Sequence, residues 1–354
     1  MSHGPKIAVL SPTTIQFVEK MACLFPGEVI KVIGPPNDDR WGWNSYARRV
    51  DEWEALGLRI EFDLRPYGQI DFSIFDILIE TFETLEMEAS WRDHCARYEC
   101  PVVVKACWSR EPFPSCPEDY YNKIVDLPVL LEMPAHIKHW QMAGFSDVSF
   151  LFNPVGNWWF DTPWTGAVGN AVMILSGKDQ WRRAESHGLD LFERLRARFP
   201  GRVHLHDGLV QYRTSRDMSY MLSGARAFLA LDIPQGHGER PLSLAFSEAL
   251  AAGVPVAARD LPGLDYKDFI TSNGVATNNF EALSDFVGRC LEDLDFARTC
   301  SKESRRIALD NFSNSRLQTA YLDVFNRARE AWRESKGGHR RPVVTSAYTK
   351  HYKE

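Results

Sequence analysis

Short apolar runs and longer amphipathic or polar segments alternate along the whole chain. The first half contains the runs KIAVLS, GEVIKVIG, LRIEFDL, FDILIE, CPVVVKAC, LPVLLE and DVSFLFN. A second series contains NAVMILSGK, VHLHDGLV, ARAFLALD, PVAARD and GVATNN, and the segment QWRRAESHGLDLFERLRARF, residues 180–199, predicts a helix between its first two runs. Continuous apolar strands that alternate with helices are typical of parallel sheets covered on both faces. The pattern therefore predicts an α/β protein with two doubly wound, Rossmann-like domains in tandem.

The alternation breaks near residue 155 in VGNWWFDTPWTGAVGN, a stretch rich in Gly, Pro and Trp. Such a composition is typical of a hinge or linker between domains. We predict a first domain over residues 1–160 and a second over 166–314. The pattern is helical from 280 to 335, and we expect the helix over 315–335 to pack back on the first domain. Residues 336–354 are polar and basic, which predicts a flexible tail.

Composition places the chain among soluble globular proteins. The hydrophobic content is 44% and the charged content 25% of 354 residues, values typical of that class, and the length suits two domains. No apolar run is long enough to cross a bilayer, and the N-terminal run IAVL is too short for a signal-peptide core. Seven cysteines, an odd number, favour reduced thiols and a cytoplasmic location.

The net charge of -6 is distributed unevenly. Residues 1–165 carry 14 Lys and Arg against 24 Asp and Glu, and the remainder carries 27 against 23. Nucleic-acid binders concentrate basic side chains because their affinity depends on neutralising phosphates. The acidic first half therefore disfavours a nucleic-acid partner. The mildly basic second half suits a small anion.

The segment ERPLSLAFSEALAAGVPVAARDLPG, residues 239–263, predicts an apolar helix followed by a short buried strand. Pro241 suits the first helical turn and Gly253 the position just past the end, so we expect the helix over 242–252. Arg240 then occupies the cap, where Ser, Thr, Asp or Asn normally accepts from the free backbone N–H groups. Those N–H groups are then available to an anion such as a phosphate. Water or a nearby loop is the alternative partner.

Glu248 stands in the middle of this apolar helix. It shares a face with Leu244, Ala245, Ala251 and Ala252 by the i±3 and i±4 spacing, and a carboxylate there needs hydrogen-bond donors. Helical side chains lean toward the N-terminus, so the carboxylate points toward the free N–H groups. A ligand with an anion at the helix start and hydroxyl groups farther in would satisfy both. The alternative is an internal Glu–Arg pair.

The same residues resemble the donor-binding segment of GT-B glycosyltransferases, in particular the retaining family 4. Members of that family carry two Glu separated by seven residues, followed by an Ala-x-Gly-x-Pro-Val entry to a strand. Glu248 matches the second Glu, which the resemblance implies holds the donor ribose. The first Glu should fall at Arg240, but the chain has Glu239, one position out of register. Either the preceding loop is one residue longer and Glu239 reaches the sugar, or its role has lapsed.

The resemblance extends to LSGK, which is similar to the family's strand-end Gly-Arg. It implies that Gly177 and Lys178 bind the donor diphosphate, and that Arg183, with Arg182 beside it, supplies a second cation. Such cations would neutralise the diphosphate and stabilise the leaving phosphate. A solvated helix face is the alternative for the two arginines. The remaining implied donor residues are Arg240, Leu242, Ser243 and Leu244.

The first half departs from the family pattern. The expected Gly-rich loop after the first strand reads SPTTIQ, and the expected His after PVVVKAC is absent. NPVGNWWF is similar to the family's interdomain passage, with Gly156 where Asp is common. Our acceptor-side candidates are therefore a hydroxyl and two rings on which a sugar could stack, namely Thr13, Trp43 and Trp108, although most large aromatics are core residues.

The resemblance implies a hexosyltransferase-type glycosyltransferase that moves a sugar from a nucleotide diphosphate donor, with retention of configuration. The acceptor would be a glycan, a lipid-linked molecule or a small molecule held mainly by the first domain. We expect no cofactor and no metal, because helix N-termini and cations would serve the diphosphate. Two alternatives remain open. One is a sugar-nucleotide epimerase or hydrolase on the same fold, and the other is a non-catalytic nucleotide-sugar binder.

Overall fold

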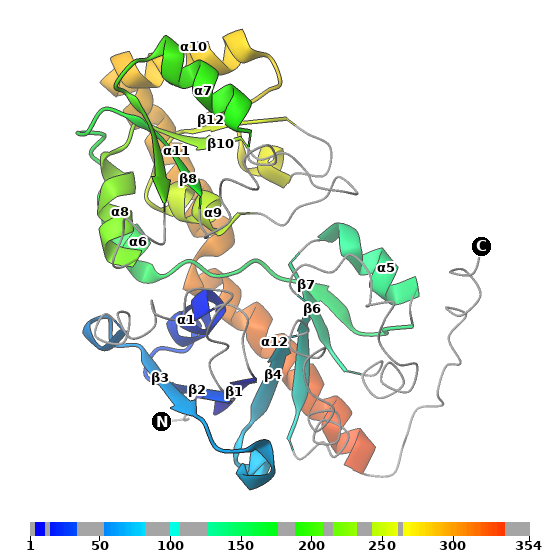
Figure 1. Ribbon diagram of the computed structural model, residues 1–354. Helices are drawn as coiled ribbons and strands as arrows, with labels where there is room; N and C mark the ends of the chain where they lie inside the picture. Colours follow the sequence, from blue (N-terminus) through cyan, green and yellow to red (C-terminus); the bar gives the residue numbers. More distant parts are fainter. Residues whose placement is uncertain are drawn as a thin grey trace. The chain divides into compact units, whose positions relative to one another are not determined.

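A computed structural model of the chain describes residues 4–10, 15–33, 53–81, 100–106, 127–132, 134–142, 144–175, 188–207, 215–231, 243–260 and 265–336. The described chain divides into two compact units (Figure 1). The first unit contains the described residues up to Asn153 together with those from Leu317 onward, and the second contains Pro154–Arg316. Each unit is built around its own parallel sheet.

The described part of the first unit contains a sheet with the strand order β3-β2-β1-β4-β5-β6-β7, in which all neighbouring pairs are parallel. Its strands are β1 (Ile7–Leu10), β2 (Val29–Ile33), β3 (Arg59–Asp63), β4 (Ile77–Thr81), β5 (Val102–Ala106), β6 (Val129–Leu131) and β7 (Val148–Phe150). Each of these strands falls within an apolar run of the sequence. The prediction of a parallel sheet in the first half is therefore confirmed.

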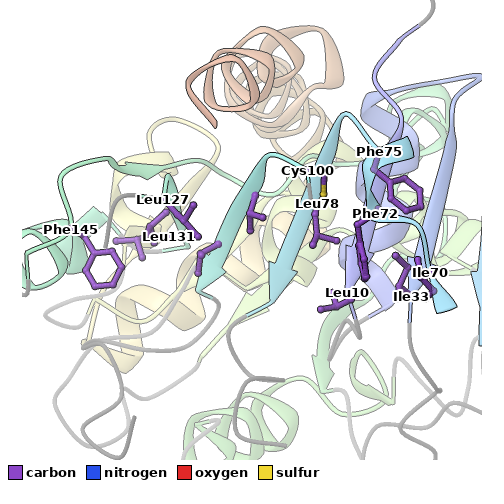
Figure 2. Packing of buried hydrophobic residues seen from close by; sticks show 14 of the residues in the cluster. Leu10, Ile33, Ile70, Phe72, Phe75, Leu78, Cys100, Leu127, Leu131 and Phe145 are labelled. Carbon is purple, nitrogen blue, oxygen red and sulfur yellow. The ribbon is translucent and has the colours of Figure 1, made fainter. Parts of the chain in front are cut away.

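Helices cover this sheet on both faces. The described helices of the first unit are α1 (Ile15–Leu24), α5 (Ile137–Met142) and most of α12 (Asn314–Lys336), with the 3-10 turns η1 (Tyr67–Gln69), η2 (Phe72–Ile74) and η4 (Pro134–His136). Figure 2 shows one core, in which Leu10, Leu78 and Leu131 of the strands pack with Phe72 and Phe145. Covered faces explain why the inner strands are mostly apolar without alternation, whereas the edge strand β3, RIEFD, alternates.

The C-terminal helix α12 begins in the second unit, and its residues from Leu317 onward belong to the first. Gln318 Nε2 donates to the carbonyl oxygen of Leu24 at 2.7 Å. Arg327 donates from Nε to Asp147 Oδ2 at 2.9 Å and from Nη2 to Ser149 Oγ at 2.7 Å. These contacts attach α12 to α1 and to the edge strand β7.

The described part of the second unit contains a parallel sheet with the strand order β12-β11-β10-β8-β9. Its strands are β8 (Ala171–Leu175), β9 (Val203–Asp207), β10 (Ala227–Ala230), β11 (Val256–Ala258) and β12 (Gly274–Ala276). All of them fall within the predicted runs. The chain enters at β8, adds β9 on one side and then crosses back to add β10 on the other. The described strands therefore form a doubly wound sheet.

The helices of this unit lie on both faces of its sheet. They are α6 (Asn157–Asp161), α7 (Leu189–Arg198), α8 (Ser215–Gly224), α9 (Leu244–Ala251), α10 (Phe280–Glu292) and α11 (Leu294–Phe312), with the 3-10 turn η6 (Asp265–Phe269). α7 and α10, labelled near the top of Figure 1, share one core. α9 packs on β10, on α8 and on α11. None of the described helices combines the length and the apolar composition that crossing a bilayer requires.

One predicted helix is not continuous. The sequence predicted a continuous helix over 180–199, but α7 begins at Leu189, after Gly188 in the left-handed conformation with φ 70°. A helix cannot continue through such a residue, and glycine adopts this conformation without steric cost. A Cβ at Gly188 would lie 2.0 Å from the carbonyl oxygen of Leu231. The close approach of these two segments therefore explains both the glycine and the break.

The passage after Asn153 belongs to the second unit. Val155 donates from its backbone N–H to the carbonyl oxygen of Phe312 at 2.9 Å, and Gly156 occupies the cap of α6. A Cβ at Gly156 would lie 2.4 Å from the ring of Trp158. The Asp that is common in the similar family segment would therefore collide with Trp158 unless the ring moved.

Candidate functional site

Several elements of the second unit meet at the carboxyl ends of its strands. β8 lies between β9 and β10. From β8 the chain continues to β9 on one side, and from β10 it continues to β11 on the other side. The adjacent strands β8 and β10 therefore form a switch point. In doubly wound sheets, ligands bind outside the carboxyl ends of the strands at this switch point. α7 and α9 follow β8 and β10 and therefore begin at the same edge. We call the carboxyl ends of β8–β12, with the starts of α7 and α9, the second-sheet edge.

The start of α9 differs from the sequence prediction. The cap is Ser243, not Arg240, and the helix begins at Leu244, two residues later than expected. Serine has a strong preference for the cap position, and the carbonyl oxygen of Ser243 accepts from Phe246 and Ser247. The Ser243 side chain makes no capping hydrogen bond. The N–H groups of Leu244 and Ala245 have no partner among the described residues, so two donors are available at this end of the helix.

Glu248 lies on the half-buried face of α9. Leu244, Ala245 and Glu248 are partly exposed, whereas the other residues of the helix are buried. The predicted grouping therefore holds for Leu244 and Ala245, whereas Ala251 and Ala252, also predicted on this face, are buried. The available N–H groups and the carboxylate lie along the same side of a short helix. An anion and a hydroxyl-bearing group in one ligand could contact both.

The end of α9 is fixed by Gly253. This residue has φ 78°, and Gly253 and Val254 donate from their N–H groups to Leu250 and Ala249. This is the pattern of a Schellman C-cap. A Cβ at Gly253 would lie 3.0 Å from Ser301 Oγ. The glycine predicted just past the helix therefore ends it, and α9 enters β11 with a fixed direction.

Arg259 is a cation at the second-sheet edge that the sequence analysis did not single out. It directly follows β11, and its N–H donates to the carbonyl oxygen of Ala230 in β10 at 3.0 Å. Its Nη2 lies 3.3 Å from Asp190 Oδ2, in the first turn of α7. Its Nη1 is buried and has no hydrogen-bond partner. A guanidinium with a missing acceptor is costly to bury, so this edge is suited to an anionic ligand.

A sequence signal for Arg259 existed. The strand PVAARD ends in small apolar residues, and a charged residue immediately after a buried strand stands at its carboxyl end. The family resemblance implies no role for this position, whereas the fold places it at the carboxyl end of β11. Arg259 is 16% exposed and Asp190 is 60% exposed, so the contact with Asp190 is screened on one side by solvent. The ion pair leaves most of the guanidinium's hydrogen-bonding capacity to other partners.

Most predicted donor residues lie outside the described residues. They are Gly177, Lys178, Arg182, Arg183, Glu239, Arg240 and Leu242. The acceptor-side candidates Thr13, Trp43 and Trp108 also lie outside them. The structure therefore brings together Ser243, Leu244 and Glu248 on α9, and the other assignments stay predictions.

The first unit contains a second polar group of residues at the carboxyl end of its sheet. Lys105 of β5 donates from Nζ to Glu132 Oε1 at 2.9 Å, and Asn153 donates from Nδ2 to the same oxygen at 3.0 Å. Lys105 Nζ also lies 4.9 Å from the ring centroid of Phe17 in α1. We call Lys105, Glu132 and Asn153 the Lys105 cluster. Sequence analysis missed it, because FDILIE, CPVVVKAC and LPVLLE were interpreted only as strands.

The signal for this cluster was a charged residue inside an apolar run. Lys105 is 1% exposed and Glu132 is 14% exposed, although both lie within or next to apolar strands. Glu80 of β4 is fully buried and has the same parity as Leu78, so it points to the opposite face of the sheet from Lys105. Charged residues that survive in buried strands are rare unless they are paired or functional.

The described thiols are not candidates for nucleophilic chemistry. Cys23, Cys100, Cys290 and Cys300 are buried and form no disulfide. Burial raises the pKa of Cys300 to about 11, so its thiolate is scarce near neutral pH. Within the described residues, no group of three or more His, Cys, Asp or Glu side chains is placed to hold a metal ion.

No protein-family model matches the chain, and no curated protein matches it. Solved structures do. A glycosyltransferase from Rickettsia africae ESF-5 is 12% identical with a TM-score of 0.61, covering 92% of this chain and 99% of that one. HepE from Anabaena, in complex with UDP and glucose, is 13% identical with a TM-score of 0.62, covering 91% and 100%. Sucrose-phosphate synthase from Thermosynechococcus elongatus is 13% identical with a TM-score of 0.55, covering 95% and 100%.

At these identities the likeness concerns the fold. Each match extends over nearly the whole of both chains, and the two doubly wound parallel sheets agree with it. The chain therefore has the GT-B fold, and the predicted fold class is confirmed.

Proposed function

We propose that the protein is a glycosyltransferase that takes a sugar from a nucleotide diphosphate donor bound by the second unit. The observation that carries the proposal is the start of α9, where the N–H groups of Leu244 and Ala245 lack described partners on the face that carries Glu248. Support also comes from the structural neighbour HepE, which was solved in complex with UDP-glucose.

Each part of this face suits one part of a nucleotide-sugar. The N–H groups of Leu244 and Ala245 lie at the positive end of a helix dipole, which favours a diphosphate. Glu248, about one turn farther along, is suited to accept hydrogen bonds from the ribose hydroxyl groups. Arg259 supplies a partly unsatisfied guanidinium at the same edge.

The finer roles follow from the family resemblance. Lys178 and Arg183 would neutralise the charge that develops on the leaving phosphate, with Gly177 allowing close approach and Arg182 or Arg240 nearby. Glu239 would contact the transferred sugar, and Leu242 and Ser243 would line the entry to α9. Transfer with retention, without a metal, belongs to the same proposal. The acceptor would be held by the first unit.

The experiment follows nucleotide release. The protein is incubated with UDP-, GDP- and ADP-linked hexoses, with and without soluble acceptors such as methyl glycosides and glycerol. Acceptor-dependent release of the nucleotide is the expected result. A donor whose sugar is epimerised or hydrolysed without any acceptor would contradict transfer and favour the epimerase or hydrolase. Saturable binding of a donor without turnover would instead favour a non-catalytic binder. The register offset of Glu239 is the sequence feature that agrees with this alternative.

A matched pair of variants links the activity to the site. Glu248→Gln keeps the size of the side chain but removes its charge, and it should weaken donor binding by about tenfold. Glu193→Gln makes the same change on α7, where Glu193 is 51% exposed and pairs with Arg196 in the next turn. Equal donor affinity in the two variants would contradict the role assigned to Glu248.

A further inference from the structure

We propose that the Lys105 cluster is a binding subsite for a hydroxyl-bearing group, in which Glu132 and Asn153 accept hydrogen bonds and Lys105 is a positioning residue. The inference rests on the proposed function in one respect only, namely that the bound group belongs to the acceptor substrate. The binding chemistry itself follows from the geometry of the cluster.

Glu132 uses only one of its two carboxylate oxygens among the described residues. One carboxylate oxygen, Oε1, accepts from both Lys105 and Asn153. The other oxygen, Oε2, has no hydrogen-bond partner among the described residues, although the side chain is only 14% exposed. A carboxylate can accept about four hydrogen bonds. The half of Glu132 that faces away from Lys105 is therefore an unused acceptor.

The hydrogen bond to Glu132 determines the orientation of the Asn153 amide. Its amide nitrogen and oxygen are distinguished by their partners, and only the nitrogen can donate to Glu132 Oε1. The amide oxygen Oδ1 must then point away from the carboxylate. It is buried and has no hydrogen-bond partner. A buried acceptor left unsatisfied typically costs ~1–3 kcal/mol, and a ligand or a bound water can remove that cost.

The hydrogen-bonding groups that remain in the cluster determine which class of ligand it can bind. The two unused atoms, Glu132 Oε2 and Asn153 Oδ1, belong to side chains joined by one hydrogen bond, and both are acceptors. A phosphate or carboxylate would be repelled here, whereas a hydroxyl group can donate to either atom. The cation of the cluster does not change this selection, because Lys105 is 1% exposed and donates to Oε1 from within the protein.

The role of Lys105 follows from its burial and from its position on β5. Burying an ion pair is not in itself stabilising, because both ions lose their hydration. The pair therefore needs another explanation than stability. Its position provides one, since β5 and β6 are paired strands and the Nζ–Oε1 contact holds the carboxylate in one orientation. Lys105 thus fixes the direction of Glu132 Oε2 without touching the ligand.

The test measures binding of simple saccharides to the full chain by ligand-observed saturation-transfer NMR. The probes are the methyl glycosides of glucose, galactose, mannose and N-acetylglucosamine, together with glycerol, and glucose 6-phosphate serves as an anionic probe. Glu132→Gln places an amide nitrogen toward the ligand, because Lys105 and Asn153 require the oxygen on their side. Glu61→Gln is the control, since Glu61 also pairs with a lysine, Lys31, at 2.9 Å but on an exposed part of β2 and β3.

We expect at least one neutral probe to bind the wild-type chain, to bind about tenfold more weakly to Glu132→Gln, and to bind Glu61→Gln as it binds the wild type. If Glu132→Gln does not fold, the double variant Lys105→Met, Glu132→Gln replaces it, because removing both charges avoids an unpaired buried ion. The proposal is overturned if no neutral probe binds in a way that depends on Glu132, which would assign a bound water to Asn153 Oδ1. Preferential, Glu132-dependent binding of glucose 6-phosphate would overturn it as well.

A calorimetric titration of the same variants with UDP-sugars separates this inference from the proposed function. Donor affinity should be the same in the wild type and in Glu132→Gln. Saccharide binding without any nucleotide-sugar binding would leave the subsite intact and refute the proposed donor. If transfer is observed, the acceptor KM should rise in Glu132→Gln while the donor KM stays constant, a split that a purely structural role would not produce.

Discussion

The carboxyl ends of the two sheets offer opposite hydrogen-bonding groups. In the second unit, β8, β10 and β11 contain no charged residue, and the polar groups stand at the start of α9 and at Arg259, where N–H donors are left over. In the first unit, a charged residue lies within the strand itself at Lys105, and the atoms left over are acceptors on Glu132 and Asn153. One edge is therefore suited to an anion and the other to hydroxyl groups.

Under the proposed function, this contrast would match the two kinds of substrate, an anionic donor and a hydroxyl-bearing acceptor. A helix start presents donors whose partner is supplied by the ligand, so the second-sheet edge remains incomplete until an anion binds. The Lys105 cluster is preorganised by paired strands and a buried ion pair, so its acceptors have fixed directions before binding. The following changes test the contrast in order of decreasing effect.

The largest effect should come from removing the carboxylate of the Lys105 cluster. Glu132→Leu leaves the buried ammonium of Lys105 without the oxygen that it donates to at 2.9 Å, and it should lower the free energy of unfolding by about 3 kcal/mol. Adding Lys105→Met should restore most of the loss. Urea unfolding followed by circular dichroism measures both. A single variant as stable as the wild type would mean that the pair is not desolvated.

A smaller loss should follow from Gly188→Ala at the second-sheet edge. Alanine is strained at φ 70°, and its Cβ would lie 2.0 Å from the carbonyl oxygen of Leu231. We expect the free energy of unfolding to fall by about 2 kcal/mol, with weaker UDP-sugar binding because Leu231 precedes the segment that leads to α9. Gly201→Ala is a control, since Gly201 also has positive φ but open space around it. Equal losses in the two variants would show that the close approach does not matter.

Arg259→Ala tests the anionic side of the contrast. Removing the guanidinium should weaken UDP-sugar binding by about tenfold and reduce the dependence of affinity on ionic strength. Arg259→Lys should recover part of the affinity, because it keeps the charge but not the fork of donors. Arg298→Ala is the control, since Arg298 is 51% exposed and pairs within α11. Calorimetry decides the matter, and unchanged affinity in Arg259→Ala would exclude this cation from the donor site.

The smallest effect concerns an ion pair at neither edge. The hydrogen bond from Arg306 holds the pKa of Glu303 at about 2, below its ordinary value of 4.5. A lowered folded-state pKa stabilises the protein above the ordinary value, and the contribution is lost as the pH falls from 4.5 toward 2. Glu303→Gln should therefore be less stable than the wild type at pH 7 and equal to it near pH 2. Thermal unfolding across this range should leave the difference between the two edges unchanged, and a gap that persists at pH 2 would argue against this pair.

The sequence was sufficient for the sheets but not for the ends of the elements. Apolar runs identify most of the described strands because burial on both faces demands them, whereas the edge strands β3 and β9 alternate polar and apolar residues. The start of α7 was missed because its break depends on the approach of Leu231 to Gly188, a contact between residues far apart in the sequence. The cap of α9 was misplaced because Pro241 was given more weight than Ser243.

The candidate sites were predictable in part. Glu248 stood out because a carboxylate in an apolar helix contradicts its surroundings, and the same reasoning applied to Lys105 and Glu132 would have identified the Lys105 cluster. The orientation of Asn153 could not have been predicted, since only the position of Glu132 distinguishes its amide oxygen from its nitrogen. The ion pair of Arg259 likewise could not have been predicted, because it depends on the position of Asp190 in α7.

The most direct measurement is a calorimetric titration of UDP-glucose and other UDP-sugars into three proteins: the wild type, Glu248→Gln and Glu132→Gln. We expect the wild type to bind at least one of these UDP-sugars. Glu248→Gln should bind it about tenfold more weakly, whereas Glu132→Gln should bind it as the wild type does. Unchanged affinity in Glu248→Gln, or an equal loss in Glu132→Gln, would contradict the claim that the second unit binds the nucleotide-sugar through α9.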